Sequence, residues 1–184
     1  MKFLYIRMPF THDLLKYKND VFVETGTFQG DTIDILLKVD EFKESQIYSL
    51  ELSDVFYKRC KAKYANDDNV TIIHANSKYE LFNVIKNINK PITFWLDSHW
   101  SGTPDVGCDP DTICPILHEL RQIKQHHIKT HTIIVDDIRL MDGKHFPVTL
   151  DEIVAHIMDI NPNYKLVLYD DPWAERDVLV ASLE

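Results

Sequence analysis

Three acidic side chains stand directly after two apolar runs of the sequence. Asp97 follows the run ITFWL, and Asp136 and Asp137 follow the run TIIV. Carboxylates delivered to one edge of a sheet repel one another unless a cation neutralises them, and Mg²⁺ or Mn²⁺ prefers hard oxygen ligands. We therefore expect Asp97, Asp136 and Asp137 to hold a divalent ion.

His99 lies two residues beyond Asp97 and is the candidate general base. An ion beside it would polarise a substrate hydroxyl, and an imidazole that titrates near neutrality could take the proton. Two plainer interpretations stay open. His99 can hydrogen-bond a carbonyl beneath the following loop, and Asp136 or Asp137 can cap the loop that comes after it.

Residues 21–32, VFVETGTFQGDT, form an apolar strand that ends in Glu24 and runs through a turn containing Gly26 and Gly30. Glycine lets a ligand approach the backbone closely, and the start of a helix offers free N–H donors. The segment is neither a P-loop nor a full GxGxxG motif. A tight turn without a ligand is the alternative.

Two more strand ends carry polar residues that suit a nucleoside. Glu51 ends the run IYSLE, where a carboxylate can accept both hydroxyl groups of a ribose. After the next strand, Asn76 and Ser77 can meet the edge of an adenine, although simple helix capping explains them equally well.

Aromatic residues in loops offer a surface for a sugar. The rings of Trp100, Phe146 and Trp173 can stack on the C–H faces of a saccharide, with packing beneath a loop as the alternative. Other histidines are expected to be solvated surface residues: His118, His126, His127 and His156.

Apolar runs alternate with segments of helical period along the chain, which favours an α/β fold with a mostly parallel sheet. The predicted strands are Val21–Glu24, Gln46–Leu50, Val70–His74, Ile92–Asp97, Thr132–Asp136, Lys165–Tyr169 and Val178–Ser182. The predicted helices are Thr32–Val39, Asp54–Tyr64, Ser77–Ile88, Pro115–Gln125 and Leu150–Ile160. Only DDPWAERD separates the last two strands, so they should pair antiparallel.

Three less regular segments complete the chain. Residues Ser98–Ile113 follow the fourth strand and are interpreted as a substrate loop or lid, or else as a tolerated insertion. Residues 1–20 form an N-terminal extension with one short helix around His12–Tyr17. The loops Ser98–Ile113 and Arg139–Val148 would then select the substrate.

Composition sets the remaining limits. The 184 residues are 45% hydrophobic and 27% charged, which fits one globular domain over residues 1–184. With a net charge of −9 and no basic run, nucleic acid is not an expected partner. No apolar run reaches the ~20 residues of a membrane span, so no membrane is expected. Three cysteines without a CxxC pair suggest reduced thiols and a cytoplasmic protein.

The succession ETGTFQG, a strand-two acid, ANS, LDSHW and VDD resembles the class I S-adenosylmethionine (SAM)-dependent methyltransferases, from Val21 to Leu183. The resemblance implies a Rossmann-like three-layer sandwich whose seven-stranded, mostly parallel sheet has an antiparallel last strand. It also implies that SAM lies along the strand ends. The residues expected to bind SAM are Glu24, Thr25, Gly26, Thr27, Gly30, Asp31, Thr32, Glu51, Leu52, Asn76, Ser77 and Asp97.

Within that class, the acids at strands four and five resemble those of Mg²⁺-dependent O-methyltransferases of the catechol and macrolide-sugar types. The stretches LDSHWSG, DTICPILHEL and IIVDDIR are similar to small methyltransferase domains associated with glycosyltransferases, some of them in large DNA viruses, where the host cytoplasm would be the setting. The resemblance implies O-methylation of a sugar hydroxyl in a glycan, with Asp97 and His99 as catalytic residues. The expected partners are therefore a saccharide or another hydroxyl-bearing acceptor, together with a second copy of the chain or a fused glycosyltransferase.

The sequence also departs from the family pattern. Thr25 and Thr27 stand where other members have glycine or other small residues. Two further functions are compatible with the motifs: a SAM-binding module without catalysis, which would bind SAM but transfer no methyl group, and a metal-dependent hydrolase, which would need the ion but not SAM. The incomplete glycine pattern argues against a nicotinamide-dependent dehydrogenase.

Overall fold

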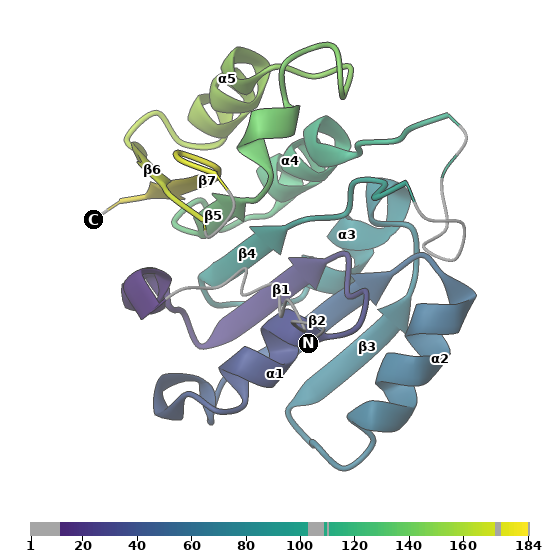
Figure 1. Ribbon diagram of the computed structural model, residues 1–184. Helices are drawn as coiled ribbons and strands as arrows, with labels where there is room; N and C mark the ends of the chain where they lie inside the picture. Colours follow the sequence, from purple (N-terminus) through teal and green to yellow (C-terminus); the bar gives the residue numbers. More distant parts are fainter. Residues whose placement is uncertain (1–11, 103–108, 110, 172–173, 184) are drawn as a thin grey trace.

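A seven-stranded sheet forms the centre of the described part of the protein (Figure 1). The computed structural model describes residues 12–102, 109, 111–171 and 174–183. The strands are β1 (Val21–Thr25), β2 (Gln46–Glu51), β3 (Val70–His74), β4 (Ile92–Leu96), β5 (Thr132–Val135), β6 (Lys165–Tyr169) and β7 (Val178–Ser182). Their order is β3-β2-β1-β4-β5-β7-β6. Strands β1 to β5 are parallel, and β7 is antiparallel to β5 and β6. The predicted α/β fold with an antiparallel last strand is confirmed.

Helices cover both faces of this sheet and make three layers (Figure 1). One face carries α3 (Ser77–Ile85), α4 (Ile116–Gln125) and α5 (Leu150–Ile160). The other carries α1 (Asp31–Leu36), α2 (Asp54–Lys63) and the short 3₁₀ turns η1 (His12–Tyr17) and η2 (Asp40–Phe42). A further 3₁₀ turn, η4 (Ile138–Leu140), follows β5. Among these residues no helix is both long and apolar enough to cross a bilayer.

Each face of the sheet has its own apolar core, and β4 contributes to both. Phe94 packs in the cluster under α3, α4 and α5, while its neighbour Trp95 packs in the cluster under α1 and α2. Successive side chains of a strand point to opposite faces, so a strand covered on both sides must be apolar throughout. This explains why the run ITFWL is completely buried.

Polar residues start the helices immediately after the strands. The Ser53 hydroxyl accepts a hydrogen bond from the Phe56 N–H group (3.5 Å), and the side-chain oxygen of Asn76, Oδ1, accepts one from the Lys78 N–H group (3.0 Å). Side-chain caps of this kind satisfy N–H groups that have no partner within the helix. The strand ends and helix starts therefore surround one edge of the sheet.

Two predicted helices end earlier than expected. The helix predicted over Thr32–Val39 stops at Leu36, because Val39 is extended (φ −98°, ψ 122°) where the chain enters η2. The helix predicted over Ser77–Ile88 stops at Ile85 and is followed by a tight turn closed by the Ile88 N–H group on the Ile85 carbonyl (2.9 Å). Other boundaries agree to within one residue.

The prediction that His126 is a solvated surface residue is wrong. His126 is 1% exposed, and its two ring nitrogens lie 3.0 Å from the His131 ring and 3.0 Å from the Ile88 carbonyl oxygen. The Ile92 N–H group donates to the other nitrogen of His131 (3.0 Å). The pair thus satisfies buried backbone groups where α4 ends and β5 begins, which no local sequence pattern reveals.

Candidate active site

One pocket runs along the carboxyl ends of β1 to β4. It contains about 1020 Å³ of space, part of which is open solvent at its mouth. Most of the residues expected to bind SAM line it: Gly26, Thr27, Asp31, Thr32, Glu51, Leu52, Asn76, Ser77 and Asp97. Glu24, Thr25 and Gly30 are not among the residues that line it. Ligands of open α/β sheets bind at this edge, so the pocket lies where a mostly parallel sheet is expected to bind a ligand.

The glycine turn is a place of close backbone approach. Gly26 has φ +90°, and a Cβ atom there would overlap the backbone carbonyl of Asp97. Its N–H group donates to the Leu50 carbonyl (2.9 Å), which ties the turn to β2. Gly30 has φ +81°, and a Cβ there would overlap the hydroxyl of Tyr64. Both glycines are needed for packing of the protein itself, whether or not a ligand is bound.

Glu24 lies beneath the turn and not in the pocket wall. It is 1% exposed, and the Ser49 hydroxyl donates to its carboxyl group (2.5 Å). The hydroxyls of Thr27 and Ser49 are in turn 2.6 Å apart. Burial raises the pKa of Glu24 to about 8, against the opposing effect of the Ser49 hydrogen bond. Glu24 therefore supports the turn through Ser49 and Thr27.

Glu51 is held by backbone groups on both sides. One carboxylate oxygen accepts the Phe28 N–H group (2.8 Å) and the other accepts the Ser53 N–H group (2.7 Å). Burial raises its pKa, and these hydrogen bonds oppose the rise. Each oxygen keeps a second lone pair, so the carboxylate can still accept two hydroxyl groups in a fixed orientation.

The end of β3 is joined to the loop that follows β4. Asn76 caps α3 with its oxygen and donates from its amide nitrogen to Asp109 (3.0 Å). Lys78 also contacts Asp109, at 3.3 Å. The backbone N–H of Asp111, ahead of the Asn76 and Lys78 contacts, lowers the pKa of Asp109. Asn76 therefore does cap the helix, as the plainer interpretation proposed. Asp109 adds a hydrogen-bond acceptor to this part of the pocket, and sequence reasoning missed it.

His99 lines the pocket and lies between two carboxylates. Its Nδ1 atom is 3.2 Å from Asp97, and its Nε2 atom is 2.8 Å from Asp137. Burial by itself would lower the pKa of His99, but Asp137 and Asp97 outweigh it and raise the pKa to about 10. A carboxylate faces each ring nitrogen, and this arrangement favours the doubly protonated ring. In that form His99 orients Asp97, and its assignment as the general base stays a prediction.

The three expected metal ligands do not form one group of their own. The ligand atoms that gather within 4.8 Å belong to Asp97, His99 and Asp137, and separately to Asp136, Asp137 and Asp177. The Asp137 side chain contacts His99 with one oxygen and the Arg139 guanidinium with the other (2.6 Å). Asp136 accepts the Asp137 N–H group (2.8 Å). Because Arg139 already contacts one oxygen of Asp137 and His99 the other, the set Asp97, Asp136 and Asp137 as arranged does not fit a divalent ion.

Two buried acids at the site escaped sequence reasoning. Glu119 of α4 is 1% exposed and accepts the Ser98 hydroxyl (2.6 Å), and burial raises its pKa. Asp177, just before β7, is fully buried and contacts Arg139. Glu119 falls in a helical stretch and Asp177 in a presumed hairpin turn. The one sequence signal for Glu119 is its position, because it is an acid on the apolar face of a predicted helix.

The aromatic candidates separate in the structure. Trp100 is 40% exposed and lines the pocket. Phe146 is buried against the His99 ring, with centroids 5.0 Å apart, so it packs beneath the site as the plainer interpretation proposed. Trp173 lies outside the described residues. Phe28, 40% exposed in the pocket wall, is a further aromatic that sequence reasoning missed.

Comparison with known proteins gives similarity of structure but not of sequence. A scan against models of protein families gives no match, and neither does a search of curated proteins. A putative methyltransferase from Streptococcus mutans, SMU.1697c, solved with S-adenosylhomocysteine (SAH), is similar in structure. Its TM-score is 0.59 at 13% identity, over 93% of this chain and 94% of that one.

Two further solved structures are similar. SAH-bound PaMTH1 from Podospora anserina has a TM-score of 0.61 at 14% identity, over 94% of this chain and 75% of that one. The O-methyltransferase TomG from Streptomyces achromogenes, solved with SAM, has a TM-score of 0.56 at 11% identity, over 92% and 75%. Together with the strand order, these likenesses show that the chain has the α/β Rossmann-like fold of methyltransferases.

Proposed function

We propose that this protein is a SAM-dependent O-methyltransferase that methylates a hydroxyl group of a sugar. The observation that carries the proposal is the pocket in which the glycine turn, Glu51, Asn76–Ser77 and Asp97 meet. SAM has an amino-acid end, a ribose and an adenine. The glycine turn would bind the amino-acid end, Glu51 the ribose, and Asn76 and Ser77 the adenine. The fold, shared with methyltransferases solved with SAM or SAH, supports the same conclusion.

The chemistry assigned to the site is a direct displacement. When bound, SAM supplies a methyl group on a positively charged sulfur. Asp97 is the proton acceptor for the hydroxyl, because its carboxylate lines the pocket and His99 holds it from one side. Alignment of the two reactants in the pocket supplies most of the rate in such transfers. The divalent ion predicted from the sequence has no part in this proposal.

A sugar is the proposed acceptor because of Trp100, whose exposed indole lies in the pocket wall close to Asp97. Indole faces pack well against the C–H faces of saccharides. Trp100→Ala should raise the KM for the acceptor roughly tenfold, which corresponds to the ~1.4 kcal/mol of one lost stacking contact. Tyr79→Ala removes an aromatic that is exposed outside the pocket wall and should leave the KM unchanged.

The first test is a calorimetric titration with SAH, run with and without a chelator. Wild type should bind SAH, and Glu51→Gln should bind it at least roughly tenfold more weakly, since hydrogen bonds to charged groups contribute about 1.5–3 kcal/mol. Glu44→Gln changes an exposed glutamate at the other end of β2 and serves as the matched control. Wild type that binds no SAH under any condition would refute the proposal.

The second test offers SAM and a panel of saccharides and measures SAH formation. Asp97→Asn should abolish turnover and leave SAH affinity largely intact. A loss of SAH affinity as large as the loss of turnover would contradict the assigned role of Asp97. SAH binding without transfer to any acceptor would instead favour a non-catalytic SAM-binding module.

A further inference from the structure

The side chain of Arg139 lies between two buried carboxylates. One terminal nitrogen of its guanidinium group, Nη1, is 2.6 Å from Asp137 and also contacts Asp177. The two carboxylate groups are 1% and 0% exposed. Carboxylates removed from water in this way require a compensating cation or protonation. The guanidinium supplies that charge and remains protonated throughout the pH range of proteins.

Asp177 fixes both the backbone and the side chain of this arginine. Its carbonyl oxygen accepts the Ile138 N–H group (2.9 Å), and its Oδ1 atom accepts the Arg139 N–H group (2.7 Å). Its Oδ2 atom contacts the guanidinium. The residue just before β7 thereby holds the turn η4, in which the Arg139 guanidinium contacts Asp137.

The other Asp137 oxygen faces His99 Nε2 at 2.8 Å. A Mg²⁺ ion needs its oxygen ligands at about 2.0–2.1 Å, in near-octahedral order. An ion ligated by Asp137 would have to displace either the guanidinium or the imidazole. The pattern of acids predicted a cation here, and the structure already holds one, supplied by the chain itself.

We propose that Arg139 is the resident cation of the acidic cluster Asp136–Asp137–Asp177, in place of the divalent ion that the sequence predicts. Asp177 is the residue that positions it. The inference concerns the charge balance of the cluster and does not depend on the proposed methyl transfer. It implies that the protein keeps its site geometry in the presence of a chelator.

The test is a titration with Mn²⁺ alone, followed by calorimetry and by the loss of the free-ion electron paramagnetic resonance signal. Wild type should bind no Mn²⁺ at this cluster at millimolar concentration. Arg139→Met removes the charge and should gain a Mn²⁺ site whose Kd lies at least roughly tenfold below the millimolar range in which wild type does not bind. The reason is that a unit charge a few ångströms away interacts strongly with an ion in a buried site. Arg139→Lys retains the charge and should resemble wild type.

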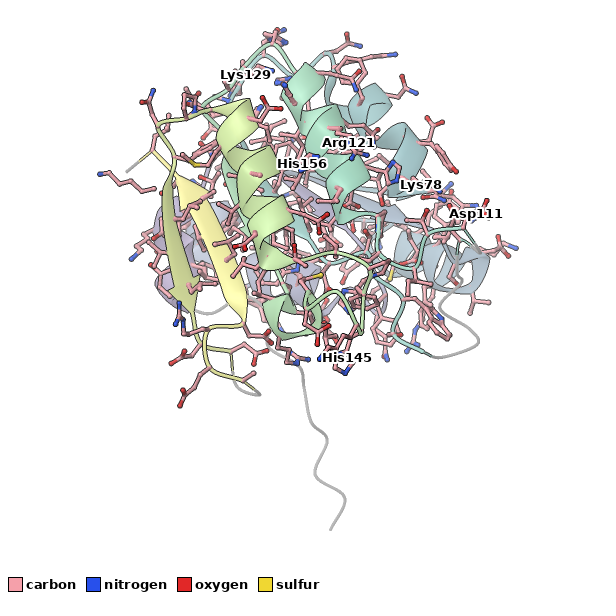
Figure 2. All side chains as sticks on the ribbon, turned by 90° about the horizontal axis from the view of Figure 1, so that it is seen from above. Lys78, Asp111, Arg121, Lys129, His145 and His156 are labelled. Carbon is pink, nitrogen blue, oxygen red and sulfur yellow. The ribbon has the colours of Figure 1, made fainter. Side chains whose placement is uncertain are left out.

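Arg121→Met is the matched control, since this arginine is exposed on α4 and has no ion pair among the described residues (Figure 2). It should bind Mn²⁺ no better than wild type. Thermal melts of the same samples report folding, and SAH titrations report the cofactor pocket. A failure of the proposed function would therefore appear as absence of SAH binding and would leave the Mn²⁺ result unaffected.

Two results would overturn the proposal. One is stoichiometric, micromolar Mn²⁺ binding by wild type that disappears in Asp137→Asn. The other is Arg139→Met that folds and melts cooperatively yet gains no Mn²⁺ affinity. The wild-type titration decides the matter even if Arg139→Met does not fold.

Discussion

The chain holds the carboxyl groups in the pocket wall differently from those beneath the pocket. Glu51 is oriented by two backbone N–H groups, and Asp97 faces the His99 ring. Glu24 and Glu119 lie buried beneath the pocket, each with a serine hydroxyl as a donor. Burial raises the pKa of both. Burial therefore favours the protonated form of the two carboxyl groups beneath the pocket.

The glycine turn provides a sharp steric test. Gly26→Ala should abolish SAH binding and destabilise the protein by several kcal/mol, because the added Cβ overlaps the Asp97 carbonyl and separates β1 from β4. Gly102→Ala is the control, since Gly102 also has a positive φ (+82°) but has open space around its Cβ position. It should cost only the roughly 1–2 kcal/mol of a left-handed residue. Thermal melts showing equal effects would contradict the steric argument.

The buried Glu24 predicts a pH dependence of stability. Its folded pKa of about 8 exceeds the ordinary value of 4.5, so its contribution is fully present below pH 4.5 and is lost as the pH rises through 8. Between pH 6 and pH 9 the loss should be roughly 2–3 kcal/mol. Glu24→Gln should remove this part of the decline in Tm, whereas Glu41→Gln, at an exposed position, should not. Parallel Tm curves for wild type and Glu24→Gln would be inconsistent with a buried, protonated Glu24.

The acids that follow apolar runs could be predicted, because a strand that ends at the edge of a parallel sheet delivers its next residue to the pocket. Glu51 and Asp97 illustrate this. Glu119 and Asp177 could not, because they reach the site through packing of α4 and of the β7 hairpin. The partner of Asp137 also depends on tertiary structure, so the sequence indicated a cation without identifying Arg139.

At the scale of elements, apolar runs and connection lengths were sufficient for most of the fold. A linker of eight residues is too short for a crossover helix, so the antiparallel pairing of β6 and β7 followed directly. Helix ends were less predictable, because Val39 turns extended where helical periodicity continues. The buried pair His126–His131 was missed because both residues stand in a polar stretch between α4 and β5.

That junction should weaken the protein in acid. The Ile92 N–H group occupies Nδ1 of His131, and burial lowers the pKa of His131 from 6.5 to about 3. The neutral ring's contribution is therefore present above pH 6.5 and is lost as the pH falls toward 3. Between pH 6.5 and pH 5 the loss should be roughly 1–2 kcal/mol.

His131→Gln can still accept from Ile92 without titrating, so its Tm should fall less steeply over this range. His127→Gln, at the exposed neighbouring histidine, is the control. The groups that face the pair are His127 and Lys129, both of which oppose protonation of His131. A wild-type Tm that stays level from pH 6.5 to pH 5 would rule out this role.

At the scale of the whole molecule, charge distinguishes the two forms of the cofactor. The chain carries a net charge of −9, and acids line the pocket. SAM has a positive sulfur and SAH a neutral one, so the electrostatic field should favour SAM and assist release of SAH. Raising ionic strength from 0.1 M to 1 M shortens the screening length from about 10 Å to about 3 Å.

SAM affinity should therefore weaken more than SAH affinity as NaCl is added. Competition calorimetry measures both, and Asp97→Asn should reduce the difference between the two salt dependences. Equal salt slopes for SAM and SAH in wild type would show that the field does not discriminate between them.

The position of β7 also has a consequence for the order in which the protein is made. In the sheet, β7 lies between β5 and β6, although it is the last of the strands along the chain. During synthesis on the ribosome, β6 has no sheet neighbour, and one edge of β5 stays open, until β7 emerges. Asp177, which holds Arg139, arrives with that same segment. The acidic cluster is thus assembled only when the sheet itself is completed, so a partly synthesised chain cannot present a finished site.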